Sequence, residues 1–141
     1  MILCTRAILL LLAFLLLTAC TSNLGEEPTE SLEGRRVPPT IITPQQAEEM
    51  ILHGGVIILD VRTQAEFELG HIENAVLLPY NQIAELAPTL ISDKNQTILV
   101  YCQAGRRSRI AAEALADLGF TAVYDFGGLQ DWHGEVFRPN R

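Results

Sequence analysis

One segment of the sequence places a cysteine beside a glycine and several arginines. It reads Cys102-Gln103-Ala104-Gly105-Arg106-Arg107-Ser108. Nearby guanidinium groups and the N-terminus of a following helix favour the thiolate form of Cys102, and a thiolate is a nucleophile. Gly105 can adopt a positive φ, which lets the loop turn its backbone amides toward the sulfur or toward an anion. The alternative is a buried structural cysteine, which rarely has such neighbours.

A strand and a helix are expected to position this cysteine. Residues 97–101 form a β-branched and aliphatic run, which predicts a strand buried on both faces. Residues 108–118 have apolar side chains at helical spacing, and Gly119 ends the helix. The expected apolar face of the helix comprises Ile110, Ala111, Ala114, Leu115 and Leu118. Cys102 would then follow a parallel strand at its carboxyl end, where α/β folds place their sites.

The remaining pattern alternates helices with strands. Thr43 with Gln46, and Thr63 with Glu66, form capping boxes that predict helix starts. The first helix should cover residues 44–53, and the second is short. A helix over residues 81–91 is interrupted by Pro88. The further strands cover residues 56–59, 75–78 and 122–124, and a short terminal helix runs through Trp132. This alternation predicts an α/β fold with a parallel sheet covered on both faces.

Composition narrows the function. The 141 residues suit one domain, and 10 basic against 17 acidic residues give a net charge of −7. This charge argues against nonspecific binding to nucleic acid or to anionic membranes. Three cysteines without a CxxC pair or a zinc-ligand spacing predict neither a disulfide framework nor a metal site.

The N-terminal part has the pattern of an export leader. Arg6 precedes an apolar run over residues 7–17, which is short for a membrane span. The run ends at Leu17-Thr18-Ala19-Cys20, which resembles the lipobox of bacterial lipoproteins. The resemblance implies a signal peptide over residues 1–19, cleavage before Cys20 and lipidation of its thiol. An uncleaved anchor and an ordinary cleaved signal are the alternatives.

A flexible tether is expected over residues 20–40, because residues 26–39 are rich in Glu, Pro, Gly and Ser. Together with the lipobox, this predicts a domain outside the cytoplasm that a lipid anchors to a bacterial membrane.

The part from residue 41 to 137 resembles a single rhodanese (sulfurtransferase) domain. The order and spacing of several motifs carry the resemblance. They are Leu59-Asp60-Val61-Arg62, Glu66-Phe67, Gly70-His71-Ile72, Ala75, Pro79, the Cys102 loop, and Gly127-Gly128 with Trp132. The resemblance implies a doubly wound α/β domain with a five-stranded parallel sheet. It also implies that Cys102 takes sulfane sulfur from a thiosulfate-like donor as a persulfide and passes it to cyanide, a thiol or a protein acceptor. No cofactor is implied.

Several residues around Cys102 have expected roles with an alternative each. Arg106 and Arg107 are candidates for binding the oxyanion of the donor, or they form a solvated helix start. Arg62 either reaches the pocket or pairs with Glu66, four residues later. Asp60 is expected to support the loop by accepting backbone hydrogen bonds. Gln103, Ala104, Gly105 and Ser108 complete the active loop.

Two other functions compete with sulfur transfer. Some rhodanese-like domains are non-catalytic binding or sulfur-carrier modules, usually after loss of the cysteine. Cysteine phosphatases and arsenate reductases use a Cys-x5-Arg loop. In this chain Ser108 occupies the sixth position after Cys102, where such a loop has its arginine. Loops of thiosulfate-specific two-domain members of the rhodanese family often have a basic residue two positions after the cysteine, where this chain has Ala104, so the preferred donor is left open.

Overall fold

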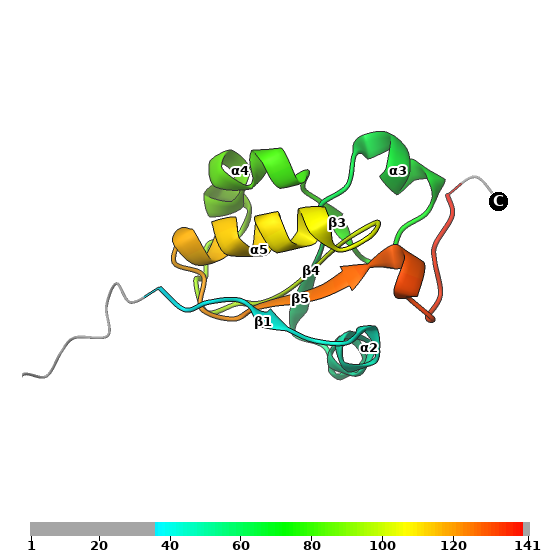
Figure 1. The fold of residues 1–141 in the computed structure, drawn as a ribbon, viewed down its shortest axis with the longest axis horizontal. Helices are drawn as coiled ribbons and strands as arrows, with labels where there is room; N and C mark the ends of the chain where they lie inside the picture. Colours follow the sequence, from blue (N-terminus) through cyan, green and yellow to red (C-terminus); the bar gives the residue numbers. More distant parts are fainter. Residues whose placement is uncertain (1–35, 140–141) are drawn as a thin grey trace, which may run out of the picture. The chain divides into compact units, whose positions relative to one another are not determined.

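A computed structural model describes residues 36–139, which form a five-stranded parallel sheet with helices on both faces (Figure 1). The strands run in the order β1-β5-β4-β2-β3 across the sheet. Their bounds are β1 (Thr40–Ile41), β2 (Val56–Asp60), β3 (Val76–Leu77), β4 (Thr97–Cys102) and β5 (Val123–Gly128). The predicted α/β class and the five-stranded parallel sheet are therefore confirmed.

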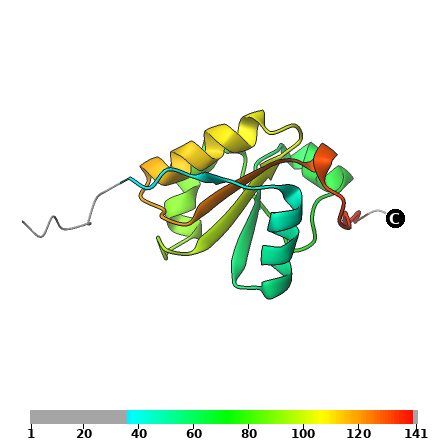
Figure 2. The same ribbon diagram turned by 60° about the horizontal axis from the view of Figure 1, so that its bottom comes forward.

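Helices cover the two faces unequally. The helices are α2 (Pro44–His53), α3 (Gln64–Leu69), α4 (Ile83–Leu90) and α5 (Arg106–Asp117), with 3-10 turns η1 (Tyr80–Gln82) and η2 (Leu129–Asp131). Helices α4 and α5 pack on one face and α2 on the other (Figures 1 and 2). Such a crossover arrangement brings the carboxyl ends of the strands to one edge of the sheet, where α3 and η2 also lie.

Both capping boxes are confirmed. The Thr43 hydroxyl accepts from the amide of Gln46 at 3.2 Å, and the Gln46 side chain accepts from the amide of Thr43 at 2.9 Å. Thr63 and Glu66 repeat this exchange at 3.3 and 3.0 Å. Each box satisfies two amide donors that the first helical turn leaves without a partner, so the local sequence determines where α2 and α3 begin.

Strand β4 lies at the centre of the sheet and contributes to the cores on both faces. Ile98, Val100 and Cys102 pack in the cluster beneath α4 and α5. Leu99 and Tyr101 point the other way and pack with Ala47 of α2. This alternation follows from the two-residue period of a strand. It directs the side chain of Cys102 toward the α5 face.

Three details differ from the sequence predictions. Helix α4 continues through Pro88 to Leu90, because Ile83 and Ala87 are fully buried and the proline lies in the last turn, where its missing amide breaks few hydrogen bonds. Helix α5 begins at Arg106. Ile110, expected on its apolar face, is 43% exposed, whereas Ala112 is fully buried. The buried face, which comprises Ser108, Ala111, Ala112, Leu115 and Ala116, is rotated by about 100° about the helix axis from the expected one.

The predicted leader and Cys20 lie outside the described residues. The sequence predicts a tether as far as residue 40, but Thr40 already pairs with Tyr124 in the sheet. Arg36 forms ion pairs with Glu113 and Asp117 of α5. The chain is thus attached to the domain from residue 36 onward. No helix within residues 36–139 is long and apolar enough to cross a membrane.

Candidate active site

Cys102 is the last residue of β4, and not the first residue after it as the sequence suggests. The residue is 1% exposed and lies beside Gly128, the last residue of β5. The pairing register between the two strands shifts between Val100 and Cys102. Such irregularities redirect side chains near sites, and here the shift occurs next to the candidate nucleophile.

The loop after Cys102 closes around the sulfur. Gly105 has φ +88°, in the left-handed region that its sequence position predicts, and its amide donates to Cys102 Sγ at 3.1 Å. Burial raises the pKa of the Cys102 thiol, whereas hydrogen bonds from loop amides and from Ser108 lower it. The contributing amides belong to Ser108, Ala104 and Gly105. The hydrogen bonds prevail, so the pKa lies below its ordinary value and the thiolate is favoured.

Ser108 holds the loop against the neighbouring strand. Its side chain is buried, and the hydroxyl lies 3.0 Å from the carbonyl oxygen of Gly105 and 3.2 Å from that of Gly127. The residue also contributes both its amide and its hydroxyl to the surroundings of the sulfur. Ser108 therefore joins three parts of the site, namely the loop, β5 and Cys102.

The end of β5 supports the loop from the other side. Asp125 is 3% exposed, accepts from the amide of Gly127 at 3.0 Å and pairs with Arg109 at 3.1 Å. Gly128 lies so close to the loop that an added Cβ would be 2.5 Å from the carbonyl oxygen of Gln103. The sequence analysis missed Asp125. An acidic residue inside the apolar run before Gly127 is the signal that marks it.

Asp60 and Arg62 form a buried ion pair, with a shortest distance of 2.6 Å and exposures of 0% and 3%. Asp60 accepts from the backbone amide of Arg62 at 3.0 Å, and not from the Cys102 loop as predicted. The guanidinium of Arg62 makes the contact with the loop instead, because it donates to Gln103 Oε1 at 3.3 Å. It also donates to the carbonyl oxygen of Gly70 at 2.7 Å.

Glu66 pairs with Arg107, so of the two alternatives for Arg62 the ion pair with Glu66 is wrong, and Arg62 lines the pocket instead. The guanidinium of Arg107 donates to the two carboxylate oxygens at 2.6 and 2.8 Å. This contact lowers the pKa of Glu66 to about 2. Arg107 is therefore partly neutralised. Arg106 is exposed and has no ion pair within the described residues.

A pocket of about 390 Å³ adjoins the loop at Gln103. Its polar lining comes from Arg62, Glu66, Gln103 and Arg138, and its apolar lining from Leu69, Leu129, Trp132 and Val136, with Gly70 between them. Trp132, one of the motifs that carry the family resemblance, also packs against Phe126 in the core. The sequence analysis did not include Leu69, the last residue of α3, and it did not include Val136 or Arg138, whose segment has no periodic pattern. Residues 36–139 contain no group of side chains suited to holding a metal ion.

The family of the chain follows from a match over most of this domain. The model of the rhodanese-like domain matches residues 43–135, which include β2, β4, β5 and the Cys102 loop. The chain belongs to the rhodanese family. The rhodanese resemblance is thereby confirmed, whereas the lipoprotein leader remains a prediction.

Named relatives agree with this assignment. Thiosulfate sulfurtransferase PspE of Escherichia coli (strain K12) is 40% identical over 73 residues, which are 52% of this chain and 70% of the relative. Thiosulfate sulfurtransferase GlpE of Coxiella burnetii is 35% identical over 92 residues, 64% of this chain and 84% of the relative. A solved structure described as a rhodanese with anions from E. coli is 35% identical, with a TM-score of 0.55, and covers 58% of this chain and 96% of its own.

This rhodanese domain therefore has a role in rhodanese-type sulfur transfer. The competing phosphatase hypothesis requires an arginine six positions after the cysteine, and this chain has Ser108 there. In the structure, the Ser108 hydroxyl contacts the carbonyl oxygens of Gly105 and Gly127 and so supports the loop around the sulfur.

Proposed function

We propose that Cys102 is the nucleophile of a thiosulfate-type sulfurtransferase. The observation that carries the proposal is the closed loop, in which the amide of Gly105 lies 3.1 Å from Cys102 Sγ. The lowered pKa of the thiol supports the same role, because only the thiolate attacks a sulfur donor. The loop amides then face the negative charge of the sulfur in each state of the reaction.

The reaction has two covalent steps. The Cys102 thiolate attacks the outer sulfur of thiosulfate, the S–S bond of the donor breaks, and sulfite leaves with the bonding electron pair. The resulting persulfide carries its negative charge on the terminal sulfur, where loop amides stabilise it as an oxyanion hole stabilises an oxyanion. An acceptor such as cyanide or a thiolate attacks that sulfur and restores the Cys102 thiolate.

The arginines have different roles in this proposal. Arg106 is exposed and free of ion pairs within the described part of the chain, so it is the candidate that binds the oxyanion of the donor. Arg107 is paired with Glu66, and its guanidinium also faces Cys102, where it stabilises the negative charge of the sulfur. Arg62 is a positioning residue, because its buried guanidinium connects Asp60 to Gln103 of the loop.

Intact mass spectrometry tests the proposal directly. The purified protein should gain the mass of one sulfur atom with thiosulfate and lose it again with cyanide. The Cys102→Ser variant should gain none. A gain in this variant, or none in the wild-type protein with any sulfane donor, would overturn the proposal. A persulfide that forms but is not released by cyanide would indicate a sulfur carrier for a protein acceptor.

We also propose that the domain is exported and anchored by a lipid on Cys20. The proposal rests on the apolar run over residues 7–17 and on the lipobox-like Leu17-Thr18-Ala19-Cys20. Cells that express the chain should incorporate a labelled fatty acid into it, and Cys20→Ala should abolish the label. Labelling that persists in the variant would refute the lipid anchor.

A further inference from the structure

The chain enters the domain at the end of the sheet where the strands begin, which we call the amino end. The guanidinium of Arg36, the first residue that the structure describes, forms ion pairs with Glu113 and Asp117 in the last two turns of α5. Thr40 then pairs with Tyr124 at the beginning of β5. Two separate contacts therefore fix the course of the chain at the amino end.

The candidate active loop lies at the opposite, carboxyl end of the sheet. Helix α5 begins at Arg106, directly after the loop, and its 12 residues extend for about 18 Å before they reach Asp117. Strand β5 connects the same two ends, because it begins near the partner of Thr40 and finishes at Gly128, beside Cys102. Figures 1 and 2 both show the segment before β1 at one end of the domain and α3 with η2 at the other.

The tether that the sequence predicts spans little more than this separation. Fifteen residues, 21–35, lie between Arg36 and the proposed lipid site at Cys20. A flexible chain of this length has a root-mean-square span of about 22 Å. To bring the active loop to the membrane, the tether would have to run back along the whole of α5, and this stretching lowers its entropy. The free energy of the tether therefore favours an orientation in which the amino end faces the membrane.

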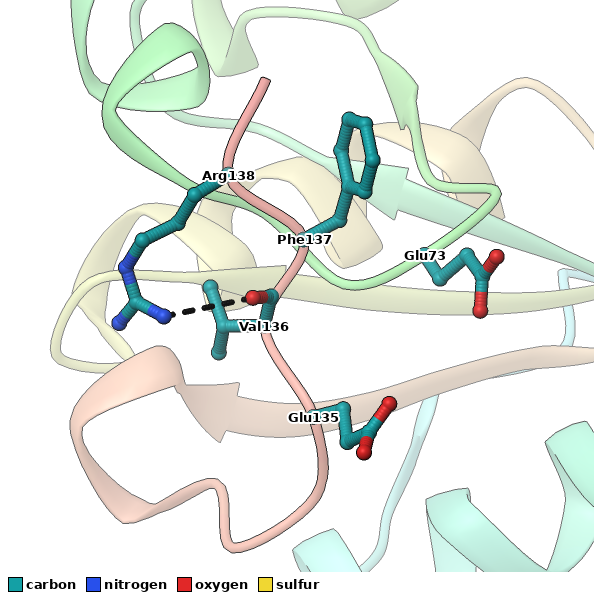
Figure 3. Close-up of a pocket in the computed structure, with 5 residues that line it drawn as sticks. All are labelled: Glu73, Glu135, Val136, Phe137 and Arg138. Atoms are coloured by element: carbon teal, nitrogen blue, oxygen red, sulfur yellow. Dashed lines mark hydrogen bonds between the residues drawn. The ribbon is translucent and has the colours of Figure 1, made fainter. Parts of the chain in front are cut away.

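The carboxyl end is suited to contact with water. Figure 3 shows the charged side chains of Glu73, Glu135 and Arg138 in the lining of a pocket of about 400 Å³. Backbone hydrogen bonds of 3.0 and 2.7 Å between His71 and Phe137 hold the C-terminal segment at this end. Contact with a bilayer would remove water from these charges, and anionic headgroups would repel the two carboxylates. The charges thus favour the same orientation as the point of entry.

We propose that the anchored domain turns its active loop away from the membrane and passes sulfur to thiol acceptors dissolved in the surrounding water, not to groups held in the bilayer. The inference rests on the proposed lipid anchor at Cys20 and on the proposed sulfur transfer at Cys102. In the transfer, the acceptor thiolate attacks the terminal sulfur of the persulfide, the S–S bond breaks, and Cys102 leaves as a thiolate with the electron pair. The acceptor becomes the new persulfide, so atoms and charge balance without a further reactant.

Energy transfer to labelled lipids measures the orientation. The lipidated full chain is placed on phosphatidylcholine vesicles that carry an acceptor dye on their headgroups. In the Cys102→Ser background, a donor dye is attached at Ser92→Cys, an exposed site before β4 at the amino end, or at Ala65→Cys, an exposed site on α3 at the carboxyl end. The dye at position 92 should lie closer to the headgroups, by up to about 20 Å, the length of β4. Equal distances, or a closer dye at position 65, would overturn the inference.

The length of the tether provides a matched control. Inserting about 20 Gly and Ser residues after Glu26 raises the span of the tether to about 33 Å, so the domain turns over more freely and the difference between the two dye positions should shrink. Arg36→Gln frees residues 36–39 and should shrink the difference by a smaller amount. A difference that survives the insertion unchanged would overturn the tether as the cause of the orientation.

The choice of acceptor tests the functional consequence. Vesicle-bound protein loaded with persulfide should pass sulfur to glutathione at the same rate as the protein in detergent. With a thiol on a lipid headgroup of the same vesicle, the insertion variant should react about tenfold faster than the wild-type chain, because the longer tether raises the effective concentration of that thiol at the loop. Equal rates with the lipid thiol would contradict the inference. Intact mass registers the persulfide and the lipid separately, so it shows whether the proposed sulfur transfer or the proposed anchor has failed instead.

Discussion

Arg107 and Glu66 join α5 to α3 through a two-pronged ion pair, although the residues are 41 positions apart in the chain. Glu66 also completes the capping box of α3. One carboxylate thus begins a helix and attaches it to the helix that follows the candidate active loop.

Because of this ion pair, the free energy of unfolding should depend on pH in the acid range. The guanidinium of Arg107 lowers the pKa of Glu66 from its ordinary 4.5 to about 2. Because the folded-state pKa is depressed, the stabilisation is complete above pH 4.5 and is lost as the pH falls toward 2. Glu66→Gln keeps the capping box and removes the charge. At neutral pH it should lower the free energy of unfolding by about 1 kcal/mol.

Urea unfolding between pH 7 and pH 2 measures the effect. The difference between the wild-type protein and Glu66→Gln should shrink below pH 4.5, where Glu66 begins to lose its stabilising charge. Glu68→Gln is the control, since Glu68 is exposed and contacts only Gln64 through its side chain within the described residues. A difference that is constant over this range would contradict the role of the ion pair.

The hydroxyl of Ser108 should set the pH dependence of sulfur transfer. Ser108→Ala removes a hydroxyl beside the sulfur that lowers the pKa of the Cys102 thiol, so this pKa should rise. The acid limb of the rate of persulfide formation should shift to higher pH. Ser92→Ala changes an exposed serine and should leave the profile in place. An unshifted profile in Ser108→Ala would show that the backbone amides alone stabilise the thiolate.

Gly128→Ala should displace the active loop. Gly128 has φ −121°, so alanine fits its backbone conformation, but the added Cβ would meet the carbonyl oxygen of Gln103. Moving the loop away from this contact should lower kcat/KM by about 100-fold, because misplacing a reacting group by about 1 Å has an effect of that order. Gly119→Ala is the control, because it has a positive φ but open space around its Cβ and lies far from the loop along α5. That control should lose stability and keep its activity.

The buried pair of Asp60 and Arg62 should be essential for stability. Arg62→Gln leaves the carboxylate of Asp60 buried without its cation, which should cost about 3–5 kcal/mol in urea unfolding. The double variant Asp60→Asn with Arg62→Gln removes that uncompensated charge and should recover part of the loss. A single variant as stable as the wild-type protein would contradict this account.

Local patterns in the sequence predicted most of the fold. The capping residues Thr43 and Thr63 act within one helical turn, and the apolar run of β4 needs no knowledge of its neighbours. The positive φ of Gly105 was predictable for the same reason. Cys102 itself was identified because the composition of its loop is rare at a structural cysteine.

The missed features all depend on contacts between distant segments. The partner of Arg107 could not be read from its own helix, since Glu66 was equally well placed for Arg62. The sequence predicted a strand only over residues 122–124, whereas β5 continues to Gly128, which pairs beside Cys102. Arg138 lies in a segment without periodicity, and only the bridge between His71 and Phe137 brings it to the pocket.

The two outermost strands of the sheet bear on how copies of the domain behave together. Strands β1 and β3 have two residues each, so the unpaired backbone groups at either side form only a short row. Exposed strand edges are templates on which further chains can add, and long ones lead to aggregation. With outermost strands this short, growth of the sheet from one molecule into the next has little template on β1 or β3.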